Sequence, residues 1–114
     1  MNKQLYSFKL STLAQLELEK IEDTSTRESI IHCVEKLVEN PDRRGKRLRK
    51  GFRGFYRIKA VKGLYRIIYR IDFEQAVVEI FFLGIRSAGS KSDVYNVGLR
   101  AIKELEQSNE NLQA

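Results

Sequence analysis

Three apolar segments joined by short turns constrain the fold of this chain more than any other feature of its sequence. They span residues 55–61, 64–72 and 77–83 and are rich in Ile, Val, Tyr and Phe, which favour β-strands. Lys62 and Gly63 form a tight turn between the first two segments, and residues 73–76 separate the last two. Turns this short join neighbouring antiparallel strands, so the sequence predicts a β-meander.

The region before the meander predicts a strand and a short helix. Apolar and polar residues alternate over residues 5–10, as in a half-buried strand that joins the sheet. Ser11 or Thr12 can then cap a helix, and Thr12 has capping-box spacing with Gln15.

Two further helices are predicted from apolar residues at helical spacing. One begins where Ser25 and Glu28 have capping-box spacing, and Pro41 ends it. With the short helix before it, this helix forms an antiparallel hairpin whose apolar face covers the sheet. The other begins near Ser92 or Asp93 and follows the meander.

The whole chain is therefore interpreted as one α+β domain over residues 1–114, in the order βααβββα. A chain of 114 residues can bury one core but not two. Its single Cys and single His exclude an internal disulfide and a structural zinc site, and we expect neither metal nor cofactor. The polar residues 107–114 are expected to fray. We find no apolar stretch of signal-peptide or membrane-spanning length and expect a cytoplasmic protein.

Positive charge is concentrated in one part of the chain. Residues 43–70 carry twelve Lys or Arg and no acid, whereas the rest carries nine basic and fifteen acidic residues. Such a field favours a polyanionic partner, with nucleic acid first and an anionic membrane or acidic protein next. A solvated basic loop is the alternative interpretation.

The tight turn also predicts which cations meet on the sheet. It places Lys59 opposite Arg66, with Arg57 on the same face. Opposed cations are destabilising by several tenths of a kcal/mol, on the order measured for cross-strand pairs, so this cluster requires an external anion such as phosphate. Arg70 shares the face, but we expect it to pair with Glu79 across the next turn.

The stretches FYRIKAVKGLYRIIYRID, VVEIFFLGIR and SDVY together resemble the RelE/ParE superfamily of toxins from toxin–antitoxin pairs. The resemblance covers nearly the whole chain and implies a RelE-like fold and a cognate antitoxin as partner. RelE-like members are ribosome-dependent endoribonucleases that cut mRNA without a metal, whereas ParE-like members inhibit DNA gyrase and generally lack the basic cluster. Because this chain keeps the cluster, the resemblance favours the RelE-like branch, with a gyrase inhibitor as the alternative.

By similarity, the catalytic residues are Arg57, Lys59, Arg66, Arg86 and Tyr95, with Arg57 standing where the best-known form has Lys. Attack of a ribose 2′-OH on the adjacent phosphate needs a base, a proton donor and stabilising cations. Arg cannot act as base, so we assign Lys59 to that role and Arg57 and Arg66 to clamping the phosphate. Arg86 stabilises or protonates the leaving oxygen. Tyr95 stacks on or orients a base of the message.

The remaining cations of the basic stretch are expected to contact ribosomal RNA through its phosphates. Their alternative role is to dock an acidic antitoxin segment that folds on binding. A third possibility for the whole protein is RNA binding without cleavage. The seven residues concerned are Arg43, Arg44, Lys46, Arg47, Arg49, Lys50 and Arg53.

Overall fold

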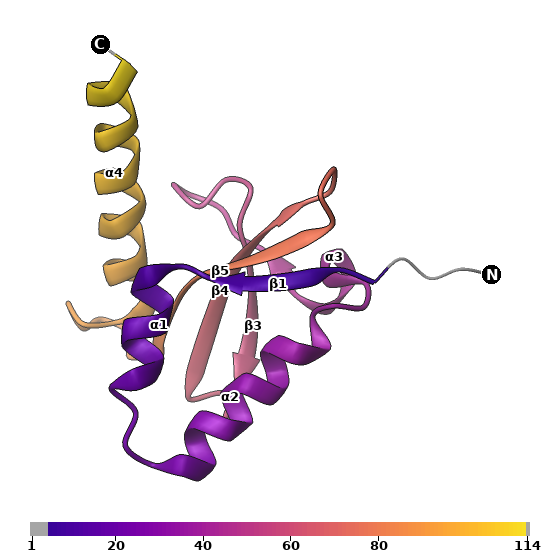
Figure 1. The fold of residues 1–114 in the computed structure, drawn as a ribbon. Coiled ribbons are helices and arrows are strands. Elements are labelled where there is room, and N and C mark those ends of the chain that lie inside the picture. Colours follow the sequence, from indigo (N-terminus) through magenta and orange to yellow (C-terminus); the bar gives the residue numbers. More distant parts are fainter. Residues whose placement is uncertain (1–4, 114) are drawn as a thin grey trace.

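A computed structural model describes residues 5–113 of the chain, with side chains described as far as residue 107. It shows a five-stranded sheet in the order β1-β5-β4-β3-β2, with helices on both faces (Figure 1). This is the predicted α+β class, with one short helix and one short strand more than expected. The elements are β1 (Ser7–Leu10), α1 (Thr12–Glu19), α2 (Thr24–Lys36), α3 (Pro41–Arg44), β2 (Lys46–Arg47), β3 (Tyr56–Ala60), β4 (Tyr65–Asp72), β5 (Val77–Ile85) and α4 (Val94–Gln113).

Strands β3, β4 and β5 form the predicted antiparallel meander. Its first turn is closed by a 3.0 Å hydrogen bond from the Leu64 amide to the Val61 carbonyl. The central residues Lys62 and Gly63 have φ angles of 55° and 86°, as a type I′ turn requires. The N-terminal strand joins the sheet as predicted, and it runs parallel to β5.

The first two helices begin at single capping side chains. Ser11 caps α1, since its Oγ accepts a 3.0 Å hydrogen bond from the Ala14 amide. Asp23 caps α2 by accepting a 2.9 Å hydrogen bond from the Thr26 amide. The predicted capping boxes at residues 12–15 and 25–28 are therefore wrong. A carboxylate at position 23 is a stronger acceptor for the positive end of a helix than a hydroxyl two residues later.

The end of α2 also differs from the prediction. The helix ends at Lys36, and the backbone that follows pairs with the residues before β1, where the Val38 carbonyl accepts a hydrogen bond from the Tyr6 amide at 2.9 Å. Pro41 does not end α2 but opens α3, in the first helical turn, where its missing N–H is not needed.

Each face of the sheet carries its own buried cluster. The predicted core lies between the sheet and helices α1 and α2, and it includes Ala14, Ile30, Val34, Leu37, Tyr56, Ala60, Ile67 and Tyr69. The second cluster lies on the face that carries the cations, where Ile68 and Phe82 pack under α4. Gly98 allows this close approach, since a Cβ there would lie 3.2 Å from the Ile68 Cδ1 atom. The cationic face is thus open only toward the ends of its strands.

Helix α4 extends past the region where it contacts the sheet. Figure 1 shows its C-terminal half standing away from the strands, and residues 103–107 are all exposed. The helix continues to Gln113, so the polar residues 107–113 are helical in this structure. Among residues 5–113, no helix has the length and apolar character that a membrane crossing would need.

Candidate functional site

The cation pair predicted from the turn is present at one end of the sheet. Lys59 on β3 lies directly opposite Arg66 on β4, and Arg57 lies opposite Ile68 one step along the same face. Side chains directly opposite each other have Cβ atoms about 4.5–5.5 Å apart. Lys59 is exposed, whereas Arg57 and Arg66 are half-buried. Across residues 5–107, no carboxylate lies within 4.0 Å of these three cations.

Arg66 is held in place by the turn that joins β3 to β4. Its Nη1 atom donates a short hydrogen bond to the Gly63 carbonyl and a longer one, of 3.4 Å, to the Tyr65 carbonyl. The guanidinium is therefore fixed beside the turn. Arg70, farther along β4, is bound to Glu79 at 2.7 Å as predicted, so its charge is compensated.

The first turn of α4 lies next to the cation pair. Arg66 has Lys59 of β3 as its neighbour on one side and Gly84 of β5 as its neighbour on the other. A Cβ at Gly84 would lie 3.3 Å from the Val94 Cγ2 atom, so α4 begins directly over this glycine. The structure thereby places Tyr95, the next residue, near the end of the sheet that carries Lys59 and Arg66.

Arg86 and Tyr95 are brought into contact. The Arg86 amide donates to the Leu64 carbonyl at 2.8 Å, which continues the pairing of β4 and β5. The Arg86 Cζ atom lies 4.9 Å from the centroid of the Tyr95 ring. This distance is typical of a cation–π interaction. Tyr95 also meets the Phe52 ring edge-on at 6.0 Å between centroids.

Asp93 belongs to this site and was not among the predicted site residues. Its Oδ2 atom accepts a 2.6 Å hydrogen bond from Arg86, so the charge of Arg86 is compensated by a neighbouring carboxylate. Burial raises the pKa of Asp93, but hydrogen bonds from Arg86 and from the amides of Ser87 and Tyr95 outweigh it and hold the pKa below its ordinary value. The only sequence signal was an Asp directly before a helical pattern, which marks a helix cap.

The predicted RNA-contacting residues are all exposed, but they do not share one face. Lys46 is opposite Arg57 and lies on the face of the cation pair. Arg47 is opposite Tyr56 and lies over that ring at 5.7 Å, on the face covered by α2. Arg44 is bound to Glu39, with 3.7 Å between charged atoms. The others, Arg43, Arg49, Lys50 and Arg53, lie in α3 and the loop after β2.

This basic stretch is anchored at two points. The buried Tyr69 hydroxyl donates a 2.7 Å hydrogen bond to the Pro41 carbonyl. Burial raises the pKa of Tyr69 far above its ordinary value, so the hydroxyl stays a donor. Phe52 is buried in the second cluster. The loop cations therefore project from a backbone with fixed attachment points.

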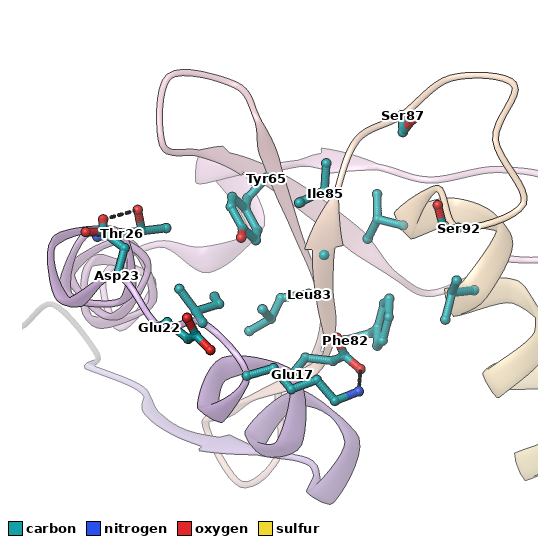
Figure 2. A pocket seen from close by; sticks show the side chains of 15 residues that line it. Glu17, Glu22, Asp23, Thr26, Tyr65, Phe82, Leu83, Ile85, Ser87 and Ser92 are labelled. Atoms are coloured by element: carbon teal, nitrogen blue, oxygen red, sulfur yellow. Dashed lines mark hydrogen bonds and ion pairs between the residues drawn. The ribbon is translucent and has the colours of Figure 1, made fainter.

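A hollow of about 780 Å³ lies between the α1–α2 connection, the end of β5 and the start of α4 (Figure 2). Its α1 side carries the carboxylates Glu17, Glu22 and Asp23, and its Lys20 is bound to Glu17 at 3.0 Å. These charges repel a phosphate backbone. We therefore place the candidate site at the cation pair and not in this hollow.

Comparison with known proteins gives a family match and several structural matches. Residues 8–88 match the family described as "ParE toxin of type II toxin-antitoxin system, parDE". No curated protein matches the chain. Three solved structures show the same fold over nearly the whole length of their toxin chains.

The first is the toxin–antitoxin complex RelBE2 of Mycobacterium tuberculosis, 28% identical over 75% of this chain and 98% of that one, with a TM-score of 0.64. The second is the intact RelBE complex of E. coli, 26% identical over 72% and 98% of the two chains, with a TM-score of 0.62. The third, a mutant of E. coli toxin RelE in the free state, is 24% identical over 86% and 98%, with a TM-score of 0.67, and supports the fold alone.

Proposed function

The chain belongs to the family of ParE toxins of type II toxin–antitoxin systems, and we propose that it is a RelE-like toxin that cleaves mRNA on the ribosome. One observation carries this proposal. Lys59 and Arg66 face each other beside Arg57, with no carboxylate in reach among the described side chains. Such a cluster lowers its own free energy by binding an anion, and the scissile phosphate of RNA is an anion of suitable size.

The proposed reaction is attack of a ribose 2′-OH on the adjacent phosphorus. Lys59, in its neutral form, takes the proton of the 2′-OH as the new O–P bond forms. Arg57 and Arg66 donate hydrogen bonds to the non-bridging oxygens as negative charge grows there. The bond to the 5′ oxygen then breaks and that oxygen takes a proton from solvent water, which leaves a 2′,3′-cyclic phosphate and a free 5′-OH.

Arg86 and Tyr95 act on the departing side of the phosphate in this proposal. Asp93 binds Arg86 through one nitrogen, and the guanidinium keeps other N–H donors for the leaving 5′ oxygen. Because a guanidinium is a poor acid, its contribution is mainly electrostatic. The Tyr95 ring orients a base of the message by stacking.

The ribosome and an antitoxin are the partners we propose. A site without a poised His should act slowly on free RNA, so a partner that orients the message increases the rate. The exposed cations of the basic stretch supply phosphate contacts for that partner. A cognate antitoxin is proposed because the similar structures include the complexes RelBE2 and RelBE.

Mapping of mRNA 5′ ends after induction of the protein in bacteria tests this proposal. We expect new ends at a constant position within codons of translated messages. The Lys59→Ala variant should give few such ends and permit growth, while it still binds the antitoxin. Growth arrest by this variant equal to that of the parent would show that the assigned site is wrong.

A second candidate function is inhibition of DNA gyrase without cleavage, and the description of the matching family favours it. Purified gyrase separates the two functions. Inhibition of supercoiling, with cellular messages left intact, would select the gyrase inhibitor. Cleaved messages with normal supercoiling would select the nuclease.

A further inference from the structure

One carboxylate connects the two ends of the loop between β5 and α4. Asp93 is 2% exposed, and no other charged residue is buried in the part of the chain whose side chains are described. Its Oδ2 atom accepts hydrogen bonds from the Arg86 Nη1 atom at 2.6 Å and the Tyr95 amide at 3.2 Å. Its Oδ1 atom accepts from the Ser87 amide. The three donors thus come from the start of the loop and the start of α4.

Burial of a carboxylate is costly unless hydrogen bonds and an opposite charge compensate it. All the compensation for Asp93 comes from the proposed site residues Arg86 and Tyr95 and from Ser87, the neighbour of Arg86. Moving the start of the loop or the start of α4 away from Asp93 would leave its buried charge without hydrogen-bond donors. The carboxylate therefore fixes where Arg86 lies relative to Tyr95, with the Arg86 Cζ atom 4.9 Å from the ring centroid.

The contact also leaves Arg86 able to act. A guanidinium has five N–H donors, and Asp93 engages the Nη1 atom. The Arg86 side chain is 36% exposed, so its other donors can reach a ligand. Without Asp93, a long side chain at this position would sample many rotamers, and few of them would be productive.

We propose that Asp93 is the positioning residue of the cleavage site, because it holds Arg86 against Tyr95 in the geometry that meets the message. This inference rests on the proposed nuclease function and gives a role to a residue that is itself buried. The competing explanation is that Asp93 only caps α4, as Asp does at many helix N-termini.

The Asp93→Asn variant separates the two explanations, since Asn caps helices as well as Asp but has no charge to hold Arg86. Single-turnover cleavage of ribosome-bound message is measured over a range of toxin concentrations. We expect the maximal rate to fall roughly ten- to hundredfold, as for a misplaced catalytic group. The concentration giving half the maximal rate should change by less than about threefold, because the buried Asp93 side chain is not available to contact RNA.

A second pair of variants tests whether the effect passes through Arg86. In an Arg86→Ala background, Asp93→Asn should lower the rate by less than about threefold further, since no guanidinium remains to be held. An equal loss in both backgrounds would assign Asp93 to the fold alone and overturn the inference. A maximal rate for Asp93→Asn equal to that of the parent would also overturn the inference. Message left intact by the parent itself would instead overturn the proposed nuclease function, and this role with it.

Discussion

At the scale of single residues, the proposed chemistry depends on one exposed lysine among arginines. Lys59→Met keeps the length of the side chain and removes the group that accepts a proton. We expect the single-turnover rate of cleavage to fall by about 10²-fold or more, as for loss of a general base. Because Lys59 is exposed, the variant should fold as the parent does.

Arg70 provides the matched control for this substitution. It is a cation on the same face of the sheet, but it is bound to Glu79 at 2.7 Å. Arg70→Met should keep the rate within about threefold of the parent, as expected for a surface charge away from the reacting atoms. Equal losses in the two variants would mean that total charge, and not the identity of Lys59, determines the rate.

The buried carboxylate at position 93 predicts a pH-dependent contribution to stability. The pKa of Asp93 is lowered from 3.8 in the folded chain, so its stabilising contribution is complete above 3.8 and is lost as the pH falls through the lower folded value. At pH 7, Asp93→Asn should lower the free energy of unfolding by about 1–2 kcal/mol. Urea denaturation at pH 7, 5 and 3 measures this difference. A difference that stays constant down to pH 3 would contradict the assignment of an ionised Asp93.

Sequence reasoning identified residues whose positions follow from the local pattern. The turn at Lys62 and Gly63 fixed the register, and the register was enough to place Lys59 opposite Arg66. Asp93 was missed because its partners come together only when the loop between β5 and α4 closes. No sequence period encodes that closure, and a short polar residue before a helix is ordinarily only a cap.

At the scale of secondary-structure elements, the basic stretch depends on a buried tyrosine of β4. Tyr69→Phe removes the hydroxyl that donates a hydrogen bond to the Pro41 carbonyl. We expect a loss of about 1–2 kcal/mol in the free energy of unfolding, because the Pro41 carbonyl loses its buried hydrogen-bond donor. Amide hydrogen exchange over residues 43–48 should become faster, since α3 and β2 lose an attachment to the sheet.

Tyr56→Phe is the control for the tyrosine substitution. Tyr56 stacks on Tyr69 with 5.4 Å between ring centroids, and it makes no hydrogen bond among the described side chains that this change would remove. The control should retain the stability and the exchange rates of the parent. Faster exchange in both variants would show that the effect is not specific to the Tyr69 hydroxyl.

The elements themselves were largely predictable, whereas their packing was not. Alternating and helical apolar patterns marked the main strands and helices, including α4. The period of β4 assigned Ile67 and Tyr69 to the core but left Ile68 among the cations, so the second buried cluster was missed. Two of its aromatic members, Phe52 and Phe55, lie in the irregular loop before β3, although residue 55 was predicted to begin the strand.

At the scale of the whole molecule, charge is divided between two regions. Residues 43–70 carry twelve cations, whereas the hollow beside α1 carries carboxylates. Replacing Arg49, Lys50 and Arg53 by Gln should weaken ribosome binding. The magnitude of the slope of the logarithm of the binding constant against the logarithm of the salt concentration should fall by up to about 2, because binding releases fewer counterions when phosphate contacts are lost.

Ribosome binding is measured at salt concentrations between about 50 and 300 mM, the range in which such slopes are determined. A control variant replaces three cations outside the stretch and should leave the slope unchanged. Equal slopes for both variants would show that the loop cations contact something other than phosphates. The control residues are Lys9, Lys20 and Lys103.

The central claim is that this chain cuts RNA by attack of a ribose 2′-OH within a cluster of its own cations. The most direct measurement uses ribosomes programmed with a message that carries a single 2′-deoxynucleotide on the 5′ side of the mapped cleavage position. We predict that the unmodified message is cut to a fragment ending in a 2′,3′-cyclic phosphate and that the 2′-deoxy message stays intact at that position. Cleavage of the 2′-deoxy message at the same position and rate would contradict the account.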